Sequence, residues 1–329
     1  MTFSSRNSFS LAIRVSTKTW DGTLEYFASD KTWTVWDGTS VLSAAPTGSG
    51  YAIYLRGTGN TVITGGDISR WQLSGSDISC IGNIENLLDY TIVESGEHPI
   101  MGIRCYAYMF LGCTSLTQAP ELPATTLASN CYDSMFYKCF NLTQAPKLPA
   151  TTLASYCYYH MFSNCTSLTQ APELPATTLA EGCYVDMFSD CTSLTHIPEL
   201  PATTLVAKCY DGMFLGCTSL KLSETRTGEY TQEYRIPFSG DGTTVKWALN
   251  NMFASTGGTF GGTPEINTTY YLSSDNMIVR GTEIATLNGY MKNMIDNAGC
   301  IIPSSTPNSN KKFKITVDDS GAISATEIT

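Results

Sequence analysis

Ten of the twelve cysteines recur in two columns, 26 residues apart along the chain and eight residues apart within each unit. The columns are Cys105, Cys131, Cys157, Cys183 and Cys209, and Cys113, Cys139, Cys165, Cys191 and Cys217. The cysteine ligands of zinc sites are usually closer together in sequence than eight residues. In a helix, eight residues span roughly 12 Å, which is too far for a disulfide, whose Cα atoms lie ~5.5 Å apart. We therefore expect small buried side chains, without metal or cofactor; a disulfide or metal role is the less favoured alternative.

A charged column also has the 26-residue spacing: Glu121, Lys147, Glu173 and Glu199. If successive turns stack ~5 Å apart, Glu173 and Glu199 stand at the carboxylate separation of retaining glycosidases. The adjacent LPATTL segment offers no apolar pocket to raise one carboxyl pKa, so a solvated rim is favoured. A glycan-active hydrolase is the remote alternative.

No other constellation suggests catalysis. The three histidines, His98, His160 and His196, form no triad pattern, and the chain has no glycine-rich phosphate loop, HExxH or GxSxG. We predict that the protein is not an enzyme and has no catalytic residues.

The elements that would position these residues form a repeat, CYxxMFxxCTSLTQAPELPATTLAxx, whose Met-Phe pairs begin at Met109, Met135, Met161, Met187 and Met213. A fixed period of this length predicts a solenoid. Within the unit, CYxxMFxxC places apolar residues at i, i+4, i+5 and i+8, which predicts a short helix. SLTQAP and LPATTLA read as short extended arms.

The unit MFxxCTSLTxxPELPATTLA resembles the BspA-like leucine-rich-repeat family of bacterial surface antigens, over about a third of the chain. The resemblance implies a right-handed leucine-rich-repeat solenoid used for adhesion or recognition, with no catalytic residues to carry over. Secreted members begin with a signal peptide. We expect none here, because the first 20 residues hold one Arg and a three-residue apolar patch, Leu11 to Ile13.

The predicted fold class is therefore β-rich α+β, with three domains. Residues 1–75 read as an all-β, sandwich-like domain with short strands and turn residues between them. Residues 76–270 form the solenoid with capping turns, with regular repeats over 105–220 and an insertion over 221–247. Residues 271–329 form a strand, a helix over 282–299 and a terminal hairpin.

Composition limits the partners. The net charge is −10 and charged residues are 15%, which argues against a basic nucleic-acid interface. No run of ~18 apolar residues is present, so we expect no membrane insertion.

The columns that differ between units are expected at the surface, because buried columns must fit the next turn. Five aromatic residues in these columns are the candidate ligand-binding residues: Tyr108, Tyr137, Tyr156, Tyr159 and His160. Tyrosine gives a large contact area with a polar tip, as sugar and protein platforms do. The alternative is that these columns vary by neutral drift, on a surface that binds no ligand.

Together these features predict a non-enzymatic recognition or structural protein. The favoured setting is the virion surface of a phage: a tail or head fibre or decoration protein, made in the host cytoplasm, that binds a host-surface protein or glycan through the repeats. Its other partners would be virion proteins and further copies of itself, a trimer if it is a fibre. Thiols compatible with the cytoplasm and a GAISATEIT hairpin that resembles those of virion fibre subunits favour this setting. The alternative is a leucine-rich-repeat adhesin on the bacterial cell surface.

The cysteine spacing generates a direct test. We expect all twelve cysteines to react as free thiols when the protein is denatured without reductant and titrated with a thiol reagent. Eight or more blocked sulfurs would contradict the interpretation of the columns as interior packing residues.

Overall fold

The computed structural model describes residues 1–15, 17–27, 32–237 and 245–279, and beyond them only three strands. The chain divides into two compact units, Met1–Val279 and Arg280–Thr329. In the second unit, β17 (Ile301–Pro303), β18 (Lys312–Val317) and β19 (Ile323–Ile328) form an antiparallel sheet in that order. The helix predicted over 282–299 lies outside the described residues.

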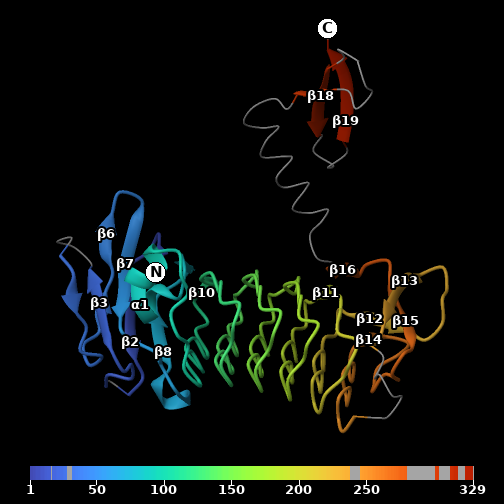
Figure 1. Cartoon of the computed structure of the whole chain (residues 1–329), viewed down its shortest axis with the longest axis horizontal. Coiled ribbons are helices and arrows are strands. Elements are labelled where there is room, and N and C mark those ends of the chain that lie inside the picture. The colour runs from blue at the N-terminus through green and yellow to red at the C-terminus, as the bar shows by residue number, and fades with distance from the viewer. Residues whose placement is uncertain are drawn as a thin grey trace. The chain divides into compact units, whose positions relative to one another are not determined.

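The first unit begins with two β-sheets (Figure 1). The larger has the order β10-β9-β1-β7-β3-β4, with β6 also paired to β7, and the smaller has the order β5-β2-β8. Their strands are β1 (Thr2–Ser5), β2 (Ser10–Ile13), β3 (Thr23–Phe27), β4 (Thr34–Val35), β5 (Leu42–Ser43), β6 (Ala45–Thr47), β7 (Gly50–Thr58), β8 (Trp71–Ser74), β9 (Ile78–Ile81) and β10 (Leu116–Gln118). Buried and half-buried residues alternate along β1 and β2, which turns one face of each strand toward the core.

The repeats begin against these sheets. Strand β10, in the first repeat, pairs in parallel with β9, and the Trp71 N–H donates to the Met109 carbonyl at 2.8 Å. The rings of Phe3 and Trp71 lie 6.1 and 6.2 Å from the ring of Phe110. The short 3₁₀ helix η1 (Asp67–Ser69) and helix α1 (Asn86–Glu94) also precede the repeats.

The prediction of a leucine-rich-repeat solenoid is wrong. Among the described residues α1 is the one α-helix, and it lies before the repeats, whose CYxxMFxxC segments are strings of turns. The extended arms form only three-residue strands, such as β11 (His196–Pro198) and β12 (Lys221–Ser223), and isolated parallel bridges such as Thr126 to Thr152. The described chain is β-rich, with several small separate sheets that neither close nor run continuously through the repeats.

The backbone of the turn segments shows why no helix forms. Alternate N–H groups bond within the unit, as from Met109 to the Tyr106 carbonyl at 3.2 Å, and the others cross to the next unit, as from Tyr106 to the Cys131 carbonyl at 2.9 Å. Every fourth residue is left-handed, at φ 57° for Arg104 and 62° for Tyr108. A right-handed α-helix does not accommodate a left-handed residue in every turn. In a helix, each N–H group would also bond to the carbonyl four residues earlier, whereas here alternate N–H groups bond to the next unit.

The alternating hydrogen bonds bring equivalent side chains into register from one unit to the next. The tyrosines Tyr106, Tyr132, Tyr158, Tyr184 and Tyr210 stack with nearly parallel rings, 5.7 or 5.8 Å apart. A second column of stacked rings runs from Phe110 to Phe214, with centroids 5.5 to 5.8 Å apart. Both columns are buried, so each unit completes the core of its neighbour.

The cysteine columns line the same core. All eleven cysteines among the described residues are buried and free. Burial raises the pKa of the Cys113 and Cys191 thiols to about 12, because the thiolate would lose its hydration. These cysteines therefore act as small apolar side chains in the native protein.

The last turn follows an insertion. Phe253 stacks on Phe214 at 5.6 Å, and the Phe214 N–H donates to the Met252 carbonyl at 2.9 Å, so Met252 and Phe253 continue the Met-Phe columns 39 residues after Met213 and Phe214. Strands from both sides of this turn in the sequence form the sheet β13-β15-β12-β14: β12 and β13 (Tyr230–Arg235) come before it, and β14 (Gly257–Gly258) and β15 (Thr269–Ser273) come after it. Strand β16 (Met277–Val279) pairs in parallel with β11.

The phenylalanine column generates a stability test. Phe162 is fully buried between Phe136 and Phe188, at 5.5 and 5.7 Å, so Phe162→Ala should cost about 3–5 kcal/mol of unfolding free energy. Phe140→Ala is the control, because Phe140 is 37% exposed, and it should cost well under half as much. Equal losses in chemical denaturation would contradict the stacked core.

Candidate functional site

The columns that vary between units have a common backbone property. These columns come as pairs of adjacent residues, and the second residue of each pair has positive φ: Asn130, Tyr156, Gly182 and Lys208; Tyr108, Ser134, His160, Asp186 and Gly212; and Gly112, Lys138, Asn164, Asp190 and Gly216. Glycine, asparagine and aspartate tolerate this conformation best, and bulky residues tolerate it poorly. Part of the variation between units therefore reflects the left-handed backbone at these positions. The sequence analysis did not predict this backbone, although the recurring Gly, Asn and Asp residues indicate it.

The structure brings four of the five predicted ligand-binding residues together. The Tyr156 and Tyr159 rings lie 5.9 Å apart, edge to face, and the Tyr159 ring lies 4.2 Å from the His160 ring. His160 in turn lies 6.1 Å from Tyr137 of the preceding unit. All four are half-buried, so each side chain is held by neighbours and still reaches solvent. We call these four residues the aromatic cluster.

Tyr108, the fifth predicted residue, lies one unit before Tyr137 and is half-buried. Burial raises the pKa of the neighbouring Asp133, and its interactions with Ser134, His160, Arg104 and Tyr108 oppose that shift. The charge of Asp133 also interacts with His160, so Asp133 relates Tyr108 to the aromatic cluster.

Tyr156 is positioned by the unit that follows. Its hydroxyl donates to Glu181 Oε1 at 3.0 Å, and its ring lies over Gly182 so closely that a β-carbon at Gly182 would collide with it. Gly182 also has φ 61°. This glycine therefore serves both the left-handed backbone and the placement of the Tyr156 ring.

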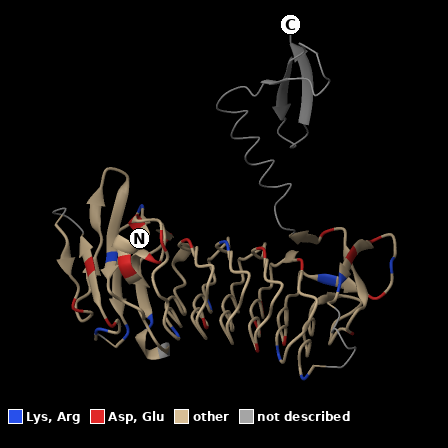
Figure 2. Ribbon diagram, viewed as in Figure 1, with Lys and Arg blue, Asp and Glu red and all other residues tan. Residues whose placement is uncertain are grey.

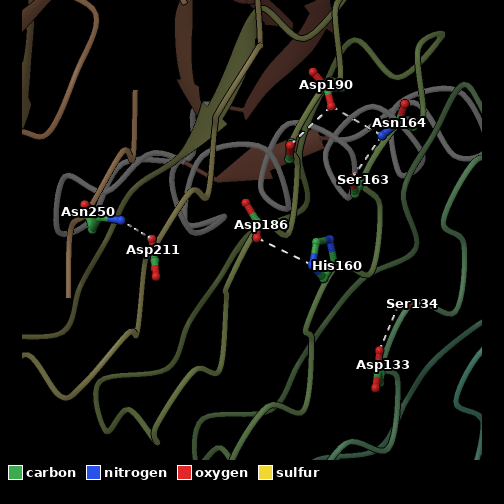
Figure 3. Close-up of polar contacts among 10 residues, drawn as sticks. Asp133, Ser134, His160, Ser163, Asn164, Asp186, Asp190, Asp211 and Asn250 are labelled. Atoms are coloured by element: carbon green, nitrogen blue, oxygen red, sulfur yellow. Dashed lines mark hydrogen bonds and ion pairs between the residues drawn. The ribbon is translucent and has the colours of Figure 1, made fainter. Parts of the chain in front are cut away.

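A row of polar side chains continues from the aromatic cluster (Figure 3). His160 Nε2 lies 3.5 Å from Asp186 Oδ2, and the Asn250 amide donates to Asp211 Oδ1 at 3.0 Å. Asp186 leans over Gly212 of the next unit, where a β-carbon would collide with its carboxylate. Side chains on this face thus extend from one unit onto the next.

Burial controls the electrostatics of the row. It raises the pKa of Asp186 to about 6, with the nearby Asp211 and Asp190 charges adding to the shift. It also lowers the pKa of His160, against a smaller opposite effect of Asp133. Charged residues are sparse along the repeat turns (Figure 2). The surface is suited to stacking and hydrogen bonding more than to long-range attraction.

The described residues hold no group of three or more His, Cys, Asp or Glu side chains arranged to bind a metal ion. A hollow of about 180 Å³ between Trp71 and Leu111 is smaller than the ~300–1,000 Å³ of small-molecule pockets. In the charged column, Glu173 is half-buried and Glu199 is exposed. None of the described helices is both long and apolar enough to span a bilayer.

Comparison with known proteins finds no family model, no curated protein and no solved structure that matches the chain. The resemblance of the repeat to the BspA-like family stays a prediction from its sequence.

The raised Asp186 pKa generates a pH prediction. Because the folded pKa of about 6 lies above the ordinary 3.8, the folded state binds this proton more tightly, and stability falls as the pH rises from about 4 to 6. Asp186→Asn should therefore be more stable than the native protein above pH 6, by about 1 kcal/mol after allowance for solvent screening, and equal to it near pH 4. Thermal unfolding from pH 4 to 8 measures this; a difference independent of pH would contradict it.

Proposed function

We propose that the protein is a non-enzymatic recognition protein that binds a host-surface protein or glycan through the aromatic cluster of Tyr137, Tyr156, Tyr159 and His160. The observation that supports this most is the convergence of these side chains, from two successive units, on one half-exposed patch. Aromatic rings with polar edges are the side chains that sugar and protein platforms use.

The repeat backbone favours binding by this patch. Each unit is hydrogen-bonded to the next through alternate N–H groups, and Tyr156 is further held by Glu181 and Gly182. Side chains that are already ordered lose little conformational entropy on binding, so more of the contact energy becomes affinity.

Charge argues for short-range contacts. The chain carries −10, and bacterial envelopes are usually anionic, so long-range forces oppose approach. Added salt should spare or strengthen binding at the cluster, because screening removes repulsion beyond a Debye length of ~8–10 Å.

The setting that we propose is a phage virion, as a tail or head fibre or decoration protein. Eleven buried, free cysteines suit folding in a reducing compartment before assembly. The repeat resemblance supports the alternative, a bacterial surface adhesin. Mass spectrometry of purified phage particles and of cell-surface fractions separates the two settings.

Replacing both Tyr156 and Tyr159 with serine tests the binding surface. Serine is tolerated at the left-handed position, as Ser134 shows at φ 52°, so the thermal midpoint should stay nearly unchanged. Adsorption to a panel of bacterial cells and to a printed glycan array should be abolished, because these rings supply the contact area.

The matched control is Phe140→Ser, which removes an exposed aromatic ring of the repeats that lies outside the cluster and should leave adsorption unchanged. Adsorption that survives the double substitution, or that collapses when salt is added, would move the binding site away from the cluster.

A further inference from the structure

An exposed tryptophan lies in the last turn of the repeats. Trp247 is 52% exposed, whereas Trp20, Trp36 and Trp71 are exposed by 4% or less. Its backbone has φ 56° and occupies the same left-handed column as Tyr156, Gly182 and Lys208. A bulky side chain in this conformation is a strained choice.

The fold does not require tryptophan at this position. The same column holds Asn130 and Gly182, both of which suit a left-handed backbone. An indole that is half exposed adds little to the core. Strain and exposure at one residue are typical of side chains kept for binding.

Two ammonium groups lie over the indole ring, in cation–π contacts. Lys246 Nζ lies 4.5 Å and Lys208 Nζ 5.3 Å from the ring centroid. The Lys208 N–H donates to the Lys246 carbonyl at 3.1 Å, which fixes the two backbones beside each other. In the described part of the chain, neither ammonium group is within ion-pair distance of a carboxylate. On a chain of net charge −10, this is a local site of unpaired positive charge beside an aromatic surface.

We propose that Lys208, Lys246 and Trp247 form a second binding site, for an anionic saccharide. The carboxylate or phosphate of the saccharide would pair with the two lysines, and its sugar ring would pack on the part of the indole that they leave exposed. A neutral sugar would leave the ammonium groups unpaired, and a simple anion would not use the indole. The site shares no residue with the aromatic cluster and does not depend on the function proposed for that cluster.

Isothermal titration calorimetry of the full chain tests the site with three probes. We expect tetragalacturonate, glucose 6-phosphate or both to bind, and the neutral maltotetraose to bind at least about tenfold more weakly. The first two probes distinguish carboxylate from phosphate as the anionic group. Binding should weaken as salt increases, opposite to the behaviour expected at the aromatic cluster.

Two variants locate the site. Trp247→Asn should reduce binding of the anionic probe by about tenfold or more without lowering the thermal midpoint, because asparagine suits the left-handed backbone. Lys208→Gln with Lys246→Gln should reduce binding similarly and remove its salt dependence. The Tyr156→Ser, Tyr159→Ser protein is the control and should bind the probe normally.

The proposal is overturned if neither anionic probe binds, if maltotetraose binds as well as they do, or if the Trp247→Asn protein retains full affinity. Loss of probe binding in the Tyr156→Ser, Tyr159→Ser protein would also overturn it, by assigning the anion to the aromatic cluster.

Discussion

The structure of the repeats depends on a left-handed residue at every fourth position of each turn segment. That residue reverses the local backbone so that one N–H bonds within the unit and the next crosses to the neighbouring unit. The crossing bonds fix the register of the units, and the register places Tyr on Tyr and Phe on Phe. Without them, the buried columns would have no common alignment and each unit would lack most of its core.

The same constraint shapes the exposed face. Side chains at left-handed positions can lean over the following unit, where a glycine leaves room, as Tyr156 does over Gly182 and Asp186 over Gly212. The aromatic cluster and the polar row are therefore parts of the backbone pattern as well as candidates for binding. Trp247 occupies the last left-handed position of its column. Its bulky side chain is 52% exposed, so burial of the indole does not account for the strained backbone.

Much of the buried structure could be predicted from the 26-residue period. The cysteine, Tyr, Met-Phe and Leu columns are buried, because residues that recur in every unit must fit the same neighbour. The helix could not be predicted correctly: apolar residues at i, i+4, i+5 and i+8 suit a helix face, but they also suit turns that repeat every four residues. Only the Gly, Asn and Asp residues at positions such as Gly182 and Asn164 indicated the left-handed backbone.

The sequence predicted which repeat positions contribute to the candidate site, but it did not predict which of their side chains contact one another. Variation between units drew attention to Tyr156, Tyr159 and His160, but their edge-to-face packing depends on side-chain directions that the turns set. The contact of Lys208 with Trp247 was not predicted, because the predicted insertion over 221–247 includes Trp247 and so separates it from the repeats.

Comparison of Lys138→Gly with Lys138→Ala tests the left-handed backbone most directly. Lys138 is exposed with φ 62°, and both variants lose the same contact of its ammonium group with the Tyr137 ring. The turn structure predicts that the glycine variant is the more stable in chemical denaturation, by about 1 kcal/mol, because an L-residue pays that much to be left-handed. A glycine variant less stable than alanine by about 1 kcal/mol, as in a helix, would contradict the account.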